Sequence, residues 1–405
     1  MPTHKWKFKS HFRREAYGWK GTSLASKRMR EAVSEIKKVG RKNPSLAGEG
    51  VIELFVRLYP ALMQIDGSSG ALGTAIHRTI DALLPVLMEA DWDMNTRGKW
   101  LDKLYEAIVE DGWGTFDGLR DYWGELCVYP GLAHLWADQF LPAVRESLGE
   151  GSCSYFTGTD MCLSCLLYTG RYDELKSVIE SQIITFWPHN QFWAKALLKQ
   201  GKPEEALAYA QQILAQDRTK NDKPSIDRFC ESVLIEVGRI EEAYETYGLD
   251  IPSYRTYLNI YRGICKKYPS IDRRKILLDC IERTGNNGKW FASAKEAGFL
   301  DIAIECAQGS GANPDVLLRA CRDFAKKEPE FAVQVGIQGI IKLVSEIFYE
   351  EVFPFEVVQA YELVQKVAVG SGRREEFKAQ LGREVLKQSC IPHLREAVVK
   401  KLEEG

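Results

Sequence analysis

The chain has 405 residues and a formal net charge of -2 at pH 7, and hydrophobic and charged residues make up 45% and 27% of it. These proportions exclude an intrinsically disordered protein and provide enough apolar side chains for a large core. By length, the chain holds two or three globular domains or one elongated array of repeated units.

Residues 1–42 form a basic segment that also contains aromatic side chains. The segment has 13 Lys/Arg and 3 Asp/Glu, a net charge of +10, so the remainder carries -12. Mixtures of cations and stacking side chains can bind single-stranded nucleic acid. The candidate residues for binding nucleic acid or an acidic partner are Lys5, Lys7, Lys9, Arg13, Arg14, Trp19, Lys20, Lys27 and Arg28.

A second interpretation of this segment is structural. A leading helix would dock electrostatically on the acidic remainder of the chain and bury its aromatic residues in the first helix pair. No apolar block follows the basic start, so no secretory signal is predicted and cytoplasmic residence is expected. No membrane span is predicted either, because the weakly polar stretch 331–344 is shorter than the roughly 20 residues that cross a bilayer.

Residues 43–150 are predicted to form helical hairpins, because apolar residues recur at helical spacing over 51–65, 74–90, 96–110 and 132–148. The glycine-rich run 66–74 precedes a helix, as phosphate-binding loops do. It lacks the lysine of a P-loop and follows a helix instead of a strand, so we interpret it as a turn capped by Ser69 or Thr74. His77 and His134 have no partnered nucleophile and are interpreted as surface or groove histidines.

Residues 151–310 contain an internal repeat. Four segments align without gaps around Gly170, Gly201, Gly238 and Gly298, and they read CLSCLLYTGRYDELKSVI, WAKALLKQGKPEEALAYA, CESVLIEVGRIEEAYETY and WFASAKEAGFLDIAIECA. Positions eight and four residues before each glycine share one face of a helix. The glycine supplies a left-handed residue that ends this helix, and a small or apolar residue five positions later lets a second helix approach the first. Each segment therefore predicts a helix, a tight turn and an antiparallel helix.

These passages, most closely ALLKQGKPEEALAYAQQIL, resemble the tetratricopeptide repeat family. The resemblance covers about residues 160–310 and implies stacked helix pairs whose first helices line a concave face. The glycines are 31, 37 and 60 residues apart, whereas the family repeats every 34 residues, so a degenerate array is expected. The longest interval has room for a divergent pair over 257–282, broken at Tyr268-Pro269.

Residues 311–405 continue the helical pattern. Helices are predicted from Asn313-Pro314 to about residue 327, from Pro329 to about residue 346, over 355–369 and again after Gly372. A last amphipathic helix over 393–402 would cap the array. No alternating strand pattern is found.

The ten cysteines are dispersed along the chain, which favours reduced thiols in the core. Cys162 and Cys165 form a CxxC with Cys153 nearby, and three thiolates could in principle share a zinc ion. No fourth ligand lies nearby, and Cys162 occupies the packing position that tryptophans hold in other repeats. We therefore interpret these cysteines as core residues and predict no metal and no cofactor.

The run 186–193 is the densest aromatic cluster of the chain. Because it enters a first repeat helix, packing between repeats is the leading interpretation. The alternative is an aromatic anchor site for a peptide, since aromatic residues are favoured in binding hot spots. The candidate partner-binding residues are Trp187, His189, Phe192 and Trp193.

The sequence therefore predicts an all-α superhelical array, an α-solenoid of antiparallel helix pairs. No paired carboxylates, catalytic triad or metal-ligand spacing indicate an enzyme. We expect a non-catalytic scaffold that binds a peptide or partner protein in a groove centred on residues 160–310. The alternative function is a nucleic-acid-associated accessory subunit that uses the basic N-terminal segment.

Overall fold

The computed structural model describes residues 4–149, 155–216, 219–251, 256–345, 352–387 and 390–404. The chain forms two compact units, Met1–Val233 and Leu234–Gly405. Within the described residues the regular structure is helical. No strand occurs there, and the β-type pairing is limited to an isolated antiparallel bridge between Ser345 and Cys390. The predicted all-α class is confirmed. None of the described helices combines the length and the apolar character needed to cross a membrane.

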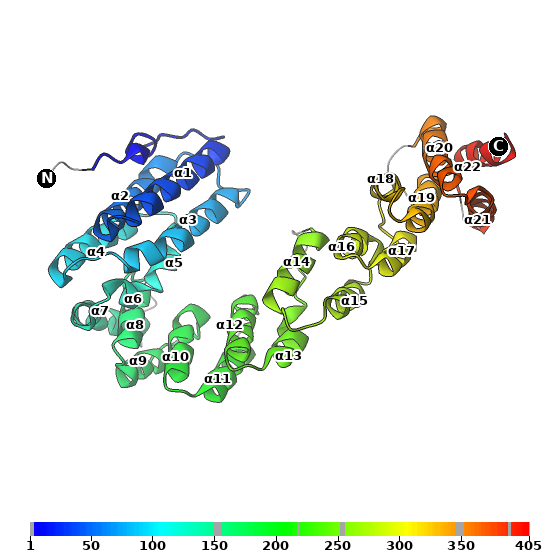
Figure 1. Ribbon diagram of the computed structural model, residues 1–405. Helices are drawn as coiled ribbons and strands as arrows, with labels where there is room; N and C mark the ends of the chain where they lie inside the picture. The colour runs from blue at the N-terminus through cyan, green and yellow to red at the C-terminus, as the bar shows by residue number, and fades with distance from the viewer. Residues whose placement is uncertain are drawn as a thin grey trace. The chain divides into compact units, whose positions relative to one another are not determined.

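The first unit begins with an irregular segment and continues as consecutive helices (Figure 1). Its elements are η1 (Lys7–Ser10), α1 (Thr22–Gly40), α2 (Pro44–Leu62), α3 (Ala71–Met88), α4 (Met94–Val109), α5 (Asp117–Arg120), α6 (Trp123–Cys127), α7 (Pro130–Leu148), α8 (Thr159–Tyr168), α9 (Tyr172–Glu180), α10 (Trp187–Lys199), α11 (Pro203–Gln216) and α12 (Lys223–Glu236), which runs past the boundary between the units.

The four helices predicted before residue 150 are present as α2, α3, α4 and α7. Helix α2 starts seven residues earlier than predicted, because the Asn43 side chain accepts a hydrogen bond from the Leu46 N–H at 2.9 Å and caps it. The short helices α5 and α6 were not predicted. Four or five residues are too few to show a helical period.

The basic segment before α1 is not a continuous helix. Only η1 is regular, and the aromatic side chains of Trp6, Phe8, Phe12 and Tyr17 are buried. The carboxylate of Glu35 on α1 accepts hydrogen bonds from the backbone N–H groups of Lys7 and Phe8, at 2.8 and 3.2 Å. The prediction of buried aromatic residues is therefore confirmed for these four. They lie in residues 4–21, where η1 is the regular element, and the helix of the basic segment, α1, begins only at Thr22.

A buried arginine ties three helices of the first unit together. Arg97, on α4, is 1% exposed, and its guanidinium donates hydrogen bonds to the carbonyls of Leu87 at 3.2 Å and Leu126 at 3.0 Å. Further bonds reach the carbonyls of Met88 and Ala90. These carbonyls lie at or just beyond the C-terminal ends of α3 and α6, where the helix dipole attracts a cation.

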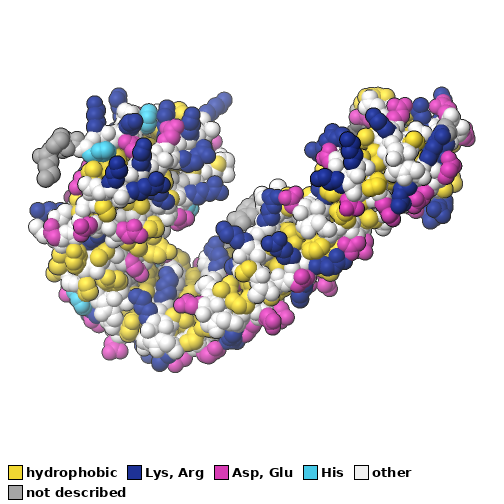
Figure 2. Space-filling view, viewed as in Figure 1, with side chains coloured by type: hydrophobic (Ala, Val, Ile, Leu, Met, Phe, Trp, Pro, Cys, Tyr) yellow, Lys and Arg dark blue, Asp and Glu magenta, His cyan; other side chains and the backbone are white. Residues whose placement is uncertain are grey.

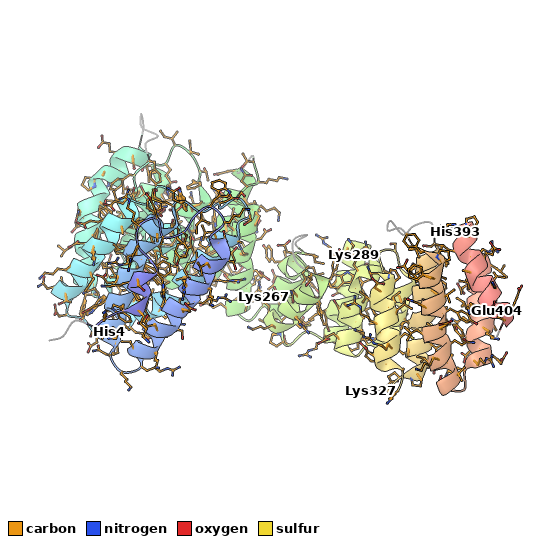
Figure 3. All side chains as sticks on the ribbon, turned by 90° about the horizontal axis from the view of Figure 1, so that it is seen from above. His4, Lys267, Lys289, Lys327, His393 and Glu404 are labelled. Atoms are coloured by element: carbon orange, nitrogen blue, oxygen red, sulfur yellow. The ribbon has the colours of Figure 1, made fainter. Side chains whose placement is uncertain are left out.

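The second unit contains the end of α12 and a further series of helices. Its elements are α13 (Ile240–Ala243), η2 (Tyr244–Gly248), α14 (Tyr257–Lys267), α15 (Arg273–Thr284), η3 (Asn287–Trp290), α16 (Phe291–Ala297), α17 (Leu300–Gln308), α18 (Pro314–Phe324), α19 (Pro329–Val344), α20 (Pro354–Gly370), α21 (Arg374–Lys387) and α22 (Pro392–Glu404). Helices α14 and α15 confirm the divergent pair predicted over 257–282. Helices α18 to α22 match the predictions for 311–405 to within a few residues. The last of them, α22, begins one residue before the predicted start at His393, which Figure 3 labels.

The core of the second unit surrounds α19. Nearly all of its side chains are buried, and it packs against α17, α18, α20 and α21. A helix that is apolar around its whole circumference belongs in the interior of a protein. The weakly polar stretch 331–344 is therefore the central core helix of this unit.

The four glycines of the sequence repeat lie in turns between consecutive helices. Gly170, Gly201, Gly238 and Gly298 follow α8, α10, α12 and α16, and their φ angles lie between 72° and 83°. In each turn the N–H after the glycine donates to the carbonyl four residues before it, at 2.8–3.0 Å. This hydrogen bond defines the Schellman motif, and a left-handed residue at its centre strains any side chain with a Cβ.

The residues at the shared repeat positions are buried. They include Leu166, Leu197, Leu234 and Ala294 four residues before the glycine and Leu175, Ala206, Ala243 and Ala303 five residues after it. Helices pack directly across three of these turns, in the pairs α8 and α9, α10 and α11, and α16 and α17. The third copy differs, because its second helix, α13, covers four residues and continues as the π-helical turn η2.

A fifth turn of the same kind joins α20 to α21. Gly372 has a φ of 71°, and the Arg373 N–H donates to the Ala368 carbonyl at 2.7 Å. Phe377, five residues after this glycine, is buried. The same helix-turn-helix geometry therefore occurs in both compact units.

Candidate functional site

The first unit contains a cavity of about 760 Å³ between α5, the N-terminal ends of α8 and α10, and α12. Its walls combine aromatic and charged side chains. The lining residues are Asp117, Gly118, Arg120, Asp121, Tyr155, Asp160, Phe186, Trp187, Pro188, His189, Gln191, Ser225, Arg228 and Phe229. A cavity of this size lies in the range of ligand-binding pockets in proteins.

The aromatic wall comes from the start of α10. Pro188 occupies the first turn of that helix, where a missing N–H carries no penalty. The backbone N–H of Trp187 donates to the Asp222 carboxylate at 3.1 Å, and its buried indole meets the Phe229 ring edge-on with centroids 5.3 Å apart. Trp187 thus fixes α10 to α12. Phe186, one residue earlier, remains 45% exposed at the cavity.

The charged wall is centred on Arg120 of α5. This residue is 6% exposed, and its guanidinium contacts Asp117 at 2.5 Å, Asp160 at 3.6 Å and the hydroxyl of Tyr155. The Nε atom has no hydrogen-bond acceptor among the described residues. Burying a charged group with incomplete partners costs free energy, and here that group faces a cavity.

Two carboxyl groups beside Arg120 titrate at unusually high pH. Burial raises the pKa of Asp121 to about 6, although Lys195 and a hydrogen bond from Gln191 at 3.4 Å partly counteract the shift. Burial also raises the pKa of Asp160 to about 6, against the attraction of Arg120. Both groups therefore carry proton equilibria close to neutral pH.

His189 completes this cluster. Its Nε2 lies 3.6 Å from Oδ1 of Asp160, and neither that oxygen nor the Nδ1 of the histidine has a hydrogen-bond partner within the described part of the chain. Burial and the neighbouring Arg120 lower the pKa of His189 to about 4, so the imidazole is neutral at pH 7. The site therefore offers unused donors and acceptors in a partly dry environment.

The four predicted partner-binding residues separate in the structure. Trp187 and His189 line the cavity, as an anchor site requires. Phe192 is buried in the core, and Trp193 is half-buried with the Lys176 ammonium 5.7 Å from its ring. For Phe192 and Trp193 the structure therefore favours packing, which was the leading interpretation of this aromatic run.

The charged half of the site was not predicted. Asp117, Arg120 and Asp121 belong to or follow the unpredicted helix α5, and Asp160 lies in the first turn of α8. The sequence places Asp121 39 residues from Asp160, so no local spacing joins them. The alternation of carboxylates and an arginine over 117–121 is the one local signal that could have marked this stretch.

The cysteines examined as zinc ligands lie in the core. Cys162 and Cys165 are buried, burial raises the pKa of Cys162 to about 12, and its Sγ lies 3.7 Å from the Ala137 carbonyl. Cys153 lies outside the described residues. Over the described residues, no group of three His, Cys, Asp or Glu side chains is arranged to hold a metal ion.

The glycine-rich run 66–74 is a turn held by its own side chains. The Asp66 carboxylate accepts a hydrogen bond from the Ser68 N–H at 2.9 Å, and Ser69 Oγ accepts one from the Ala71 N–H at 3.4 Å. The interpretation as a turn is therefore confirmed, but the predicted cap is wrong, because the N-cap of α3 is the left-handed Gly70 and makes no side-chain capping hydrogen bond. His77 lines a smaller cavity of about 310 Å³ beside this turn, and His134 lies at the surface of α7.

The basic residues of the N-terminal segment divide into paired and exposed groups. Lys9 lies 2.8 Å from Glu53, Arg28 lies 2.7 Å from Glu31, and Arg14 lies 3.8 Å from Glu15. Trp19 is the aromatic residue of the segment that stays accessible, with 68% exposure. The remaining cations are solvent-exposed, and Figure 2 shows Lys and Arg side chains gathered over α1 and the residues before it. The exposed candidates are Lys5, Lys7, Arg13, Lys20 and Lys27.

No protein-family model matches the chain, and no curated protein matches its sequence. The resemblance to the tetratricopeptide family therefore depends on the residues around the repeat glycines alone.

Proposed function

We propose that this protein is a non-catalytic, tetratricopeptide-like scaffold whose helix pairs stack as a superhelical array, and that a peptide segment of a partner protein binds in the cavity of the first unit. The recurrence of one helix-turn-helix geometry supports the array. The observation that carries the binding proposal is the cavity itself, which α8, α10 and α12 line, each the first helix of a repeated pair. First helices are the ones that present side chains to a bound peptide in such arrays.

The composition of the cavity favours a peptide over a small anion. Three carboxylates line it against two guanidinium groups, those of Arg120 and Arg228. Arg120 is already engaged by carboxylates, which leaves little positive charge for an anionic ligand. The exposed rings of Phe186 and Tyr155 can contact apolar stems or stack against a cationic side chain. A segment containing Lys or Arg beside an apolar residue fits these walls.

A peptide library displayed on phage and selected on the full chain tests this proposal. We expect selected peptides to bind the wild-type protein and to bind the Phe186→Ser variant about tenfold more weakly, because loss of a hot-spot aromatic costs more than about 1 kcal/mol. Fluorescence anisotropy with labelled peptides gives the two dissociation constants.

The matched control is Ile184→Ser, which removes an exposed apolar side chain two residues away that does not line the cavity. We expect this variant to bind within about twofold of wild type, because rim contacts contribute little. Selection that yields no peptide, or peptides that bind both variants equally well, would show that the cavity is not the binding site.

A further inference from the structure

Helix α1 carries a stripe of exposed cations along one face. Lys27, Arg30, Lys37, Lys38 and Arg41 are all solvent-exposed and recur at intervals that keep them on the same side of the helix or just beyond its end. We call this set the α1 stripe. The opposite face, formed by Ala25, Met29, Ala32 and Ile36, is buried against the unit.

The acidic residues of α1 do not neutralise the whole stripe. Helix α1 contains two glutamates, and both are engaged. Glu31 is hydrogen-bonded to Arg28, which lowers the pKa of its carboxyl, with a weaker attraction from Lys27. Glu35 accepts the two backbone N–H groups that hold η1 in place. For Arg30, Lys37, Lys38 and Arg41, no carboxylate of the described residues lies within ion-pair distance.

We propose that the α1 stripe binds the phosphodiester backbone of a nucleic acid, a function separate from peptide binding in the cavity. From Lys27 to Arg41 the stripe extends about 21 Å at 1.5 Å per residue, the axial length of about six base pairs of duplex nucleic acid at 3.4 Å each. Cations spread over this length can contact several phosphates at once. Phosphate contacts of this kind position a protein on nucleic acid without selecting a base sequence.

The structure changes which residues carry this function. Most aromatic residues of the N-terminal segment are buried, so they cannot stack on bases. Trp19 is the exposed ring that remains, and with Lys20 it precedes α1. Lys9, Arg14 and Arg28 are paired with carboxylates and drop out of the candidate set, whereas Arg30 and the cations at the end of α1 enter it.

The same geometry disfavours an acidic membrane surface as the partner. A helix that lies in a membrane interface inserts an apolar face between the lipids. The apolar face of α1 is buried inside the unit, and Leu24 is the single large apolar residue that the helix exposes. The stripe therefore offers charge without an insertable face.

Binding of labelled oligonucleotides to the full chain tests the proposal. We expect affinity to fall steeply as salt rises from 50 to 200 mM. In Arg30→Glu/Lys37→Glu, affinity should fall at least about tenfold and the slope of log K against log salt should shrink by about two, one for each lost cation.

The control is Lys326→Glu/Lys327→Glu, which makes the same change in net charge at exposed residues of the other unit. Lys327 projects into solvent beyond the end of α18 (Figure 3). We expect this variant to keep the affinity and salt slope of wild type, and circular dichroism should show equal helix content in both double variants.

Single-stranded and duplex oligonucleotides form two arms of the experiment. If a base stacks on the indole, Trp19→Ser weakens binding of the single strand and leaves binding of the duplex unchanged. If no base stacks there, Trp19→Ser changes neither arm. Both outcomes support phosphodiester binding. The proposal is overturned if neither arm binds at 50 mM salt, if the two charge-reversed variants lose affinity equally, or if phosphatidylserine vesicles bind and oligonucleotides do not.

Discussion

Among the described residues of the first unit two arginines are buried, and their surroundings differ. Arg97 is surrounded by backbone carbonyls at the ends of α3 and α6, and it stacks over the Trp92 ring at 5.2 Å. Arg120 faces carboxylates and a tyrosine hydroxyl at the wall of a cavity. The first arrangement joins helices through hydrogen bonds to groups that do not titrate near neutral pH. The second couples a buried cation to groups that exchange protons and face an open space, as a binding site requires.

The difference shows how one residue type serves stability in one place and recognition in another. Carbonyl oxygens cannot take up a proton near neutral pH, so the contacts of Arg97 do not depend on pH. The carboxylates around Arg120 can be neutralised, and a ligand can compete for them. Substitutions at both sites can therefore separate a structural cation from a site cation.

The largest effect is expected for Arg97→Ala. The change leaves several buried carbonyls without their donor and opens a cavity, so we expect a loss of about 3–5 kcal/mol in the free energy of unfolding. Urea denaturation followed by circular dichroism measures it. The loss should be the same at pH 5 and pH 7.5. A loss that shrinks at low pH would show that Arg97 has an ionisable partner after all.

A smaller and pH-dependent effect is expected for Arg120→Met. The apolar stem is kept, so the loss at pH 7.5 should be about 2 kcal/mol, and it arises mainly from leaving Asp160 ionised without its cation. Arg120 lowers the pKa of Asp160, which burial raises, so its removal raises that pKa further. The variant then takes up a proton more readily in the folded state, so its deficit should shrink as the pH falls from 7.5 toward about 6 and change little below that.

Much of the fold could be predicted because its signals are local. A glycine with a left-handed φ, an apolar position four residues before it and a small or apolar one five residues after it all lie within ten residues of sequence. The turns at Gly170, Gly201, Gly238 and Gly298 were found in this way. The central helix α19 was visible as an apolar run, although the sequence did not say that it forms the core of its own unit.

The site could be predicted only in part, because its residues come together through tertiary contacts. Trp187 and His189 stood out within one aromatic run. Asp121 and Asp160 are ordinary in sequence, and only packing of α5 against α8 brings them to the same cavity. The backbone partners of Arg97 leave no pattern in the sequence at all, since any residue supplies a carbonyl.

The smallest effect is expected for Asp121→Asn. Burial raises the folded-state pKa of Asp121 to about 6, above the ordinary value of an aspartate, so the folded chain binds this proton more tightly than the unfolded chain does. The ionised carboxylate therefore lowers the free energy of unfolding. This cost is absent below about pH 4 and fully present above about pH 6. As the pH rises from 4 to 7.5, the free energy of unfolding of the variant should therefore increase relative to that of wild type. The expected increase is on the order of 1 kcal/mol after allowance for solvent screening.

Comparing the stability of Asp121→Asn with that of wild type separates the effect of Asp121 from the effect of His189. Because the folded-state pKa of His189 is lowered to about 4, this residue reduces the free energy of unfolding as the pH falls from 6.5 toward 4. The reduction is the same in wild type and variant. Asp102→Asn, at an exposed aspartate of α4, is the control and should show no such gain. A pH-independent difference for Asp121→Asn would mean that Lys195 and Gln191 compensate the buried carboxylate fully. The cavity would then lack the spare negative charge that favours a basic peptide.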